Sequence, residues 1–215
     1  MVIDKDFDNI VSLGSFCQAA HHIRRRFGTK AYPFDWWVTP SIGLVEVIET
    51  QFSDLFKSEN MKVVIEDAGK AVMCDRYGIM HYHDFDQAKI EGEILDFLVR
   101  AECINNLSKF SYLVNRFLNL SGKILFIRVG SGYVQHYNKN QELDRLLIAR
   151  LKAGLEKILP KCEIHILILN GYNLDDLPSN VYHSEVNNYD LSHVWYGSDK
   201  GWDEMFDILK IRLSQ

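Results

Sequence analysis

The spacing of apolar and polar residues changes repeatedly along the chain, which predicts strands that alternate with helices. Short apolar runs typical of buried strands lie at residues 9–13, 123–129, 163–169 and 181–186. Apolar residues at helical spacing lie at residues 15–27, 42–55, 87–120, 141–158 and 202–213. Residues 62–66 and 71–75 flank a short glycine-containing loop, which predicts a β-hairpin. This alternation favours a sheet that is mostly parallel.

No repeat, low-complexity stretch or Pro/Gly/Ser-rich linker interrupts the pattern. We therefore predict a single α/β domain over residues 1–215, with a layered, mostly parallel sheet flanked by helices and an inserted β-hairpin. A chain of 215 residues buries about 70% of the surface that its unfolded form exposes. Such a core needs neither a disulfide nor a metal to hold it together.

The charge balance argues against several classes of partner. The chain has 24 Lys+Arg against 29 Asp+Glu, a net charge of −5, whereas nucleic-acid-binding domains are usually basic. The basic run at residues 24–26 is expected to form a solvated helix face, with an anion-binding patch as the alternative. No apolar run is long enough to span a membrane, and residues 1–8 carry three aspartates and no hydrophobic stretch. We expect a cytoplasmic protein that binds neither nucleic acid nor membrane; the sequence does not define its oligomeric state.

One of the four cysteines lies at a position that could activate it. The cysteines form no C-x-x-C pair and are expected to be free thiols, but Cys17 follows Gly14 where a predicted strand turns into a helix. Ser15 as N-cap and Gln18 three residues later form the pattern of a capping box. A thiol here would lie near unpaired N–H groups and the positive end of the helix dipole, which favour a thiolate and can hold an oxyanion. The alternative is a small buried cysteine that fills space between helix and sheet.

A second group of polar residues lies at residues 80–86, which we expect to be extended. His81 and His83 would then point to one face and Asp84 to the other, with Asp86 further along. Two histidines and a nearby acid could supply a general base with its orienting group, two metal ligands, or hydrogen bonds at a strand end. Because no third metal ligand stands at a recognisable spacing, we expect no metal and no other cofactor.

A serine-based site is one alternative. Asp190 and His193, three residues apart near the end of the chain, resemble the Asp-x-x-His element of SGNH-type esterases. In that interpretation Ser15 would be the nucleophile. The resemblance does not extend to the nucleophile motif near the N-terminus, where those enzymes have Gly-Asp-Ser and this chain has Gly14-Ser15.

A ligand-binding module without catalysis is another alternative. Arg128 and Asn170 lie at the ends of two predicted strands, where open parallel sheets bind their ligands. An arginine at this edge suits an anionic or sugar-phosphate ligand, although a buried ion pair would explain it equally well. No glycine-rich nucleotide-binding motif occurs.

Four short motifs stand in order along the chain, at residues 12–18 (SLGSFCQ), 32–36 (YPFDW), 82–85 (YHDF) and 125–128 (LFIR). Together they resemble a bacterial family of domains of unknown function described as papain-like cysteine peptidases. The resemblance extends from about residue 10 to residue 170. It implies Cys17 as the nucleophile, His83 as the base and Asp84 or Asp86 as the group that orients the imidazole. The candidates for contacting substrate are Ser15, Gln18, Asp35, Trp36, Arg128 and Asn170.

Two features depart from papain-like enzymes. Strand alternation turns Asp84 away from the face of His83, and Gln18 follows the cysteine, whereas the oxyanion glutamine of those enzymes precedes it. The second half of the chain is also closer to half of a Rossmann-like sheet than to papain. The leading hypothesis is a cysteine-dependent hydrolase or acyl transferase that acts on a peptide, acyl or glycan-linked substrate.

Overall fold

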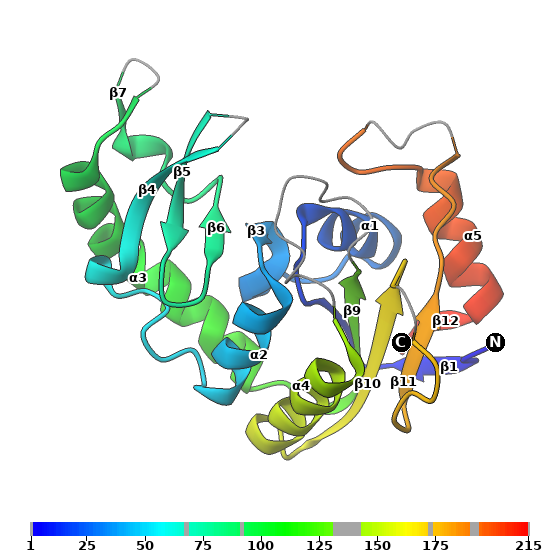
Figure 1. The fold of residues 1–215 in the computed structure, drawn as a ribbon. Coiled ribbons are helices and arrows are strands. Elements are labelled where there is room, and N and C mark those ends of the chain that lie inside the picture. Colours follow the sequence, from blue (N-terminus) through cyan, green and yellow to red (C-terminus); the bar gives the residue numbers. More distant parts are fainter. Residues whose placement is uncertain are drawn as a thin grey trace.

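A four-stranded parallel sheet forms one half of the protein (Figure 1). The computed structural model describes residues 2–66, 69–90, 93–130, 143–171, 174–189 and 194–214. The strands of this sheet are β2 (Asn9–Ser12), β9 (Gly122–Val129), β10 (Cys162–Leu169) and β11 (Val181–Ser184), in the order β11-β10-β9-β2. All three neighbouring pairs are parallel, so the carboxyl ends of the strands lie along one edge. The strands predicted from the apolar runs are confirmed.

Helices cover both faces of this sheet, which is why its strands are almost continuously apolar. The helices are α1 (Cys17–Phe27), α2 (Ser41–Glu49), α3 (Asp96–Leu118), α4 (Arg145–Ile158) and α5 (Asp199–Leu209). Helices α1 and α5 pack on one face, in the apolar cluster that contains Leu125. Helices α2, α3 and α4 contribute to the cluster on the other face, which contains Phe126. Within the described residues, no helix is both long enough and apolar enough to cross a membrane.

An antiparallel sheet lies beside the parallel one, at the left of Figure 1. Its strands are β3 (Trp37–Val38), β4 (Met61–Glu66), β5 (Gly69–Cys74) and β6 (Ile79–His81), in the order β3-β6-β5-β4. The predicted hairpin is β4 and β5. A single apolar cluster continues from Phe126 in the parallel sheet to Val72 and Ile79 in the antiparallel one. The α/β class with an inserted hairpin is confirmed, and the single domain over residues 1–215 stays a prediction.

The structure differs from the predicted helix boundaries in two places. The helix predicted over residues 87–120 begins only at Asp96, the first residue of α3. The chain closes with a short strand after α5, where the sequence predicts a helix up to residue 213. The elements not predicted are β1 (Lys5–Phe7), η1 (Pro33–Trp36), β3 (Trp37–Val38), η2 (Ser58–Asn60), η3 (Asp86–Ala88), β7 (Lys89–Ile90), β8 (Glu93–Ile94) and β12 (Ile211–Leu213).

Candidate functional site

Cys17 is the first residue of α1 and follows a tight turn at residues 13–16, called here the Cys17 turn. Gly14 (φ 73°) and Ser15 (φ 77°) both adopt left-handed conformations, and Phe16 is extended (φ −145°). The predicted capping box is wrong, because Phe16 is the N-cap residue and no side chain caps α1. The first N–H groups of the helix therefore have no side-chain acceptor, and these donors lie around the thiol.

Cys17 is half-buried, and this burial dominates the chemistry of its thiol. Burial raises the pKa of Cys17 to about 11; its own backbone N–H lowers the pKa and the Asp35 carboxylate raises it. The sequence predicts the opposite direction, because the pattern reveals the helix N-terminus but not the burial. At neutral pH the sulfur is a thiol, so a nucleophilic step needs a base. Among the described residues, no histidine contributes to the pKa shift of Cys17.

Arg128 lies beneath the Cys17 turn rather than in a ligand site. Its guanidinium donates to the carbonyl oxygens of Leu13 (2.9 Å) and Thr39 (2.6 Å) and to Ser41 Oγ (3.3 Å). The side chain is 1% exposed, and burial lowers the pKa of Arg128 to about 9. The hypothesis that Arg128 binds an anionic ligand is therefore not supported. These hydrogen bonds hold the guanidinium, and no carboxylate of the described residues forms the alternative ion pair with it.

Asn170 and Gln18 contact different parts of the chain. Asn170 Oδ1 accepts a hydrogen bond from Val186 N (2.8 Å), and Asn170 N donates to the Ser184 carbonyl (2.9 Å), so this residue fastens the segment after β11. Gln18 is buried beside Cys17, and its Nε2 has no hydrogen-bond partner. A Cβ on Gly197 would lie 2.6 Å from this Nε2, which places the Gln18 amide against the segment that precedes α5.

His81 and Asp84 form a buried pair. His81 Nδ1 lies 3.1 Å from Asp84 Oδ2, and the same carboxylate accepts hydrogen bonds from Trp37 Nε1 (2.6 Å) and Lys109 Nζ (2.8 Å). Burial raises the pKa of Asp84, but the hydrogen bonds and positive charges of His81 and Lys109 outweigh it and hold the pKa below its ordinary value. Asp84 therefore orients His81, not His83 as the resemblance implies.

This pair faces away from the residue that precedes Cys17. Met80 and Tyr82 share an apolar cluster with Phe16, whereas His81 contacts aromatic rings in the main core. Because neighbouring strand residues point to opposite faces, the sheet separates the His81 side chain from the Phe16 cluster. His81 Nε2 is buried without a hydrogen-bond partner.

His83 and Asp86 are both exposed. Asp86 forms an ion pair with Lys89 (2.5 Å). Strand β6 ends at His81, so the alternation expected over residues 80–86 stops there and the chain bends. The bend turns Asp84 back onto His81 and leaves His83 without either predicted carboxylate partner.

His21, which was not among the residues predicted for the site, shares a face of α1 with Cys17. The two residues are four positions apart, so their side chains are neighbours on the helix surface. Arg24, seven positions after Cys17, continues the same stripe, and all three side chains are half-buried. The His21 ring lies 4.9 Å from the His22 ring and 5.3 Å from the Trp195 ring, measured between centroids.

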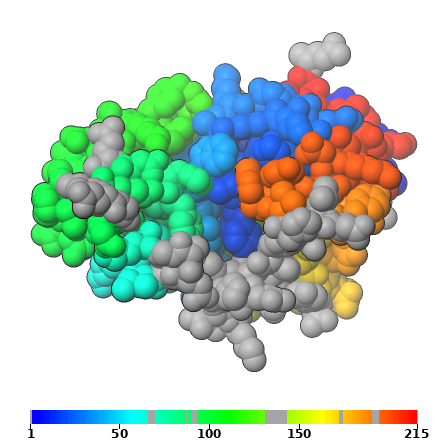
Figure 2. All heavy atoms as spheres, turned by 90° about the horizontal axis from the view of Figure 1, so that it is seen from above, coloured from blue at the N-terminus to red at the C-terminus, as the bar shows by residue number. Residues whose placement is uncertain are grey.

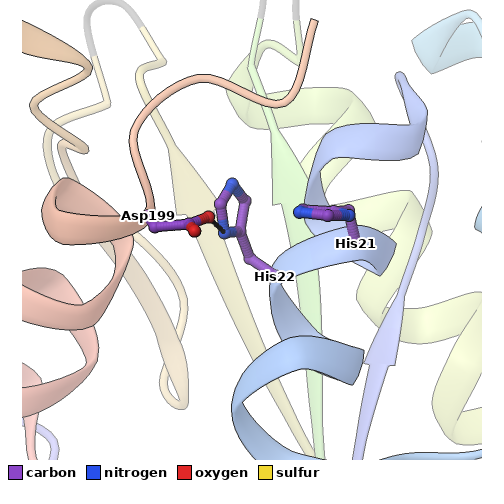
Figure 3. Close-up of side chains that lie close together, drawn as sticks. All are labelled: His21, His22 and Asp199. Atoms are coloured by element: carbon purple, nitrogen blue, oxygen red, sulfur yellow. Dashed lines mark ion pairs between the residues drawn. The ribbon is translucent and has the colours of Figure 1, made fainter. Parts of the chain in front are cut away.

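His21, His22 and Asp199 have potential ligand atoms within 4.8 Å of one another, and Figure 3 shows the His22 ring between the other two side chains. A fixed positive charge already occupies this cluster. Arg25 Nε lies 3.4 Å from His22 Nδ1 and 3.2 Å from Asp199 Oδ1. His22 Nε2 lies 2.5 Å from the Tyr196 carbonyl oxygen, and burial lowers the pKa of His22 to about 4. We assign these contacts to the packing of α1 against α5 rather than to a metal centre.

A cleft of about 560 Å³ lies between α1, η1 and α3, and is called here the α1–α3 cleft. Its polar and aromatic lining includes Arg24, Trp36, His83, Lys109, Tyr112 and Arg116. Figure 2 looks toward the carboxyl edge of the parallel sheet and shows the blue surface of α1 between the green α3 and the orange segment before α5. Asp35 itself is buried and accepts a hydrogen bond from Arg24 Nη2 (2.5 Å).

The residues of α3 that line the cleft could have been found from their spacing in the sequence. Lys109, Tyr112 and Arg116 stand at i, i+3 and i+7, which places them on one face of a helix. His21 could have been found in the same way, because it stands four positions after Cys17 on the same predicted helix. Asp190 and His193 lie outside the described residues, so the serine-based alternative is not tested there.

The comparisons with known proteins agree with the motif resemblance. The family model described as "Putative papain-like cysteine peptidase (DUF1796)" matches residues 8–170. No curated protein and no solved structure matches the chain. The match covers the Cys17 turn, the α1–α3 cleft and the strands β2, β9 and β10. The chain therefore belongs to the family that this model describes.

Proposed function

We propose that this protein is a cysteine-dependent hydrolase or acyl transferase with Cys17 as its nucleophile. The observation that carries the proposal is the place of Cys17 at the first position of an uncapped helix, at the carboxyl edge of a parallel sheet. Unpaired N–H groups at such a helix end can hold the oxyanion that forms when a carbonyl is attacked. Family membership supports the same class of chemistry.

His21 is the base that the helix geometry favours. It takes the thiol proton, and the Cys17 sulfur bonds to the carbonyl carbon. The proton then passes to the leaving amine or alcohol as its bond to the carbonyl carbon breaks, which leaves a thioester on Cys17. Water, or another acceptor in a transferase, gives a proton to His21 and cleaves the thioester, and this proton restores the thiol.

The high pKa of Cys17 makes this base necessary. Because burial raises the pKa to about 11, few molecules carry a thiolate at neutral pH before substrate binds. Transfer of the proton to an imidazole on the same helix face would create the nucleophile only when a carbonyl is in place. The proposal is therefore a base-assisted thiol rather than a resting thiolate.

Acyl transfer from p-nitrophenyl acetate tests the nucleophile. We expect a transient acetyl group on Cys17, detected by intact mass and peptide mapping, and its loss in Cys17→Ser. Cys162→Ser is the matched control because Cys162 is also a half-buried free thiol. Acetylation that is unchanged in Cys17→Ser would overturn the proposal. Loss of ester hydrolysis in Ser15→Ala with retention in Cys17→Ser would favour the serine-based alternative instead.

The base is tested separately with His21→Ala and His83→Ala. Removing a general base typically lowers a rate on the order of 10²- to 10⁴-fold. We expect this loss for the acylation step in His21→Ala, whereas His83→Ala should acylate at close to the normal rate. The reverse ranking would return the role of base to His83 and leave Cys17 as nucleophile.

A further inference from the structure

We propose that the α1–α3 cleft is a binding site for a compact anion, a phosphate or a carboxylate, carried on a flat ring. Arg116, Arg24 and Lys109 would hold the anion, and Trp36 and Tyr112 would pack against the ring. The proposal does not depend on Cys17 acting as a nucleophile, because the groups that bind the ligand lie along α3, η1 and the second half of α1.

The charge that the cleft presents to solvent is positive. Its two associated carboxylates, Asp35 and Asp84, lie beneath the surface with side chains only 4% and 6% exposed. The cations that cover them are more exposed, at 30% for Arg24 and 53% for Lys109. An approaching ligand therefore meets ammonium and guanidinium groups first. This arrangement attracts anions although the whole chain carries a net charge of −5.

Arg116 is the cation whose charge is least compensated. Its Nη1 donates to the Ala31 carbonyl (2.9 Å) and its Nη2 donates to the Tyr112 hydroxyl, both neutral acceptors. Within the described residues no carboxylate forms an ion pair with Arg116. Arg24 Nε is also without a hydrogen-bond partner. Guanidinium groups suit phosphate and carboxylate oxygens because they present pairs of N–H donors in one plane.

Aromatic rings stand beside these cations. The Arg24 guanidinium lies 5.1 Å from the centroid of the Trp36 ring, and that of Arg116 lies 4.5 Å from the Tyr112 ring. Trp36 is 36% exposed and Tyr112 is 59% exposed, so both rings have free surface. A volume of about 560 Å³ is within the range of small-molecule pockets. Phosphate and planar ring can therefore occupy the cleft together.

Calorimetric titration with phenyl phosphate, inorganic phosphate and phenol tests this proposal. We expect phenyl phosphate to bind about tenfold more tightly than either fragment, because it uses the cations and the rings together. Benzoate in a parallel titration distinguishes a carboxylate ligand from a phosphate one. Failure of both phenyl phosphate and benzoate to bind would overturn the proposal.

Arg116→Gln and Arg100→Gln form the matched pair of charge variants. Both arginines lie on α3, and Arg100 is exposed, sixteen residues or about 24 Å along the helix from Arg116. Phenyl phosphate should bind Arg116→Gln about tenfold more weakly and Arg100→Gln with unchanged affinity. Equal affinities of the two variants would contradict the site, since net charge alone would then explain the binding.

Tyr112→Leu and Phe97→Leu test the ring contact in the same way. Phe97 is an exposed aromatic residue on α3 outside the cleft. We expect Tyr112→Leu to weaken the binding of phenyl phosphate but not that of inorganic phosphate. Phe97→Leu should change neither affinity. Circular dichroism melting curves of all four variants verify folding. If Tyr112→Leu binds phenyl phosphate as the unaltered protein does while remaining folded, the proposed ring contact is wrong.

Discussion

Arg128 Nη1 donates a hydrogen bond of 2.9 Å to the carbonyl oxygen of Leu13, the residue at which the Cys17 turn begins. The same guanidinium holds the Thr39 carbonyl, so one side chain of β9 fixes the backbone before α1 and before α2. The two Nη groups of this buried cation donate to two backbone oxygens and the Ser41 hydroxyl, which offsets part of the cost of burial, while its Nε has no hydrogen-bond partner. Arg128 thus positions the backbone of the Cys17 turn.

Arg128→Met should destabilise the protein. The substitution keeps the side chain long but leaves the Leu13 and Thr39 carbonyls without donors, at a cost of about 2–4 kcal/mol in the free energy of unfolding. Urea denaturation followed by circular dichroism measures this difference. Arg150→Met is the control, because Arg150 forms an ion pair with Glu49 on the surface and its removal should leave the midpoint nearly unchanged. An unaltered midpoint in Arg128→Met would return Arg128 to the list of candidate ligand-binding residues.

Asp84→Asn should remove a stabilising contribution that depends on pH. The pKa of Asp84 is below its ordinary value in the folded protein, so its stabilisation is present above about pH 4 and is lost as the pH falls through the folded pKa. We expect Asp84→Asn to lower the free energy of unfolding by about 3 kcal/mol at pH 7 and by less at pH 3.

Asp86→Asn is the control for this experiment, because Asp86 is two residues away but exposed. Urea midpoints at pH 7 and pH 3 for the two variants give the comparison. If both variants follow the same profile, the network around His81 does not carry the stabilisation.

The sequence predicted the parallel sheet well because its central strands, β9 and β10, are buried over most of their length and are almost continuously apolar. It also predicted the position of Cys17 correctly, since a glycine between a strand and a helix marks a turn. It was less successful where tertiary contacts decide the local structure. The spacing of apolar residues from residue 87 onward predicts a helix, but β7 pairs with β8 there and α3 begins only at Asp96.

The assignment of site residues needed the structure for a related reason. The family resemblance implied Asp84 or Asp86 as the partner of His83, and alternation along an assumed strand turned Asp84 away from both histidines. In the structure β6 ends at His81, and the bend after it brings Asp84 back to the His81 ring. Arg128 lies at a strand end, as predicted, yet its Nη groups donate to the backbone carbonyls of residues 13 and 39, which are distant in the sequence. The spacing of Cys17 and His21 was visible from the outset, because it depends only on helix periodicity.

The alkylation of Cys17 should be slow at neutral pH and should rise steeply with pH. Burial raises the pKa of Cys17 to about 11, so the thiolate fraction increases about tenfold for each pH unit between about pH 8 and 10. Rates of carbamidomethylation by iodoacetamide, resolved by peptide mapping, give the profile of each cysteine. Cys17→Ser identifies the contribution of Cys162, the other half-buried thiol. A rate that already levels off below pH 8 would show that Cys17 is a resting thiolate, contrary to the base-assisted scheme.

Gly14→Ala should destabilise the protein more than Gly28→Ala, although both glycines have left-handed φ angles of 73° and 63°. Each substitution introduces a Cβ into that conformation, which costs about 1–2 kcal/mol. A Cβ on Gly14 would in addition lie 2.9 Å from Thr39 Oγ1 and 3.2 Å from the Phe34 carbonyl oxygen, whereas nothing lies within 4 Å at Gly28. The extra crowding should cost a further amount of about 1–3 kcal/mol, measured by urea denaturation. Because Gly14 lies in the Cys17 turn, Gly14→Ala should also change the alkylation rate of the thiol, and Gly28→Ala should not. Equal losses of stability would mean that the turn can move away from Thr39, and the close fit would not fix the position of Cys17.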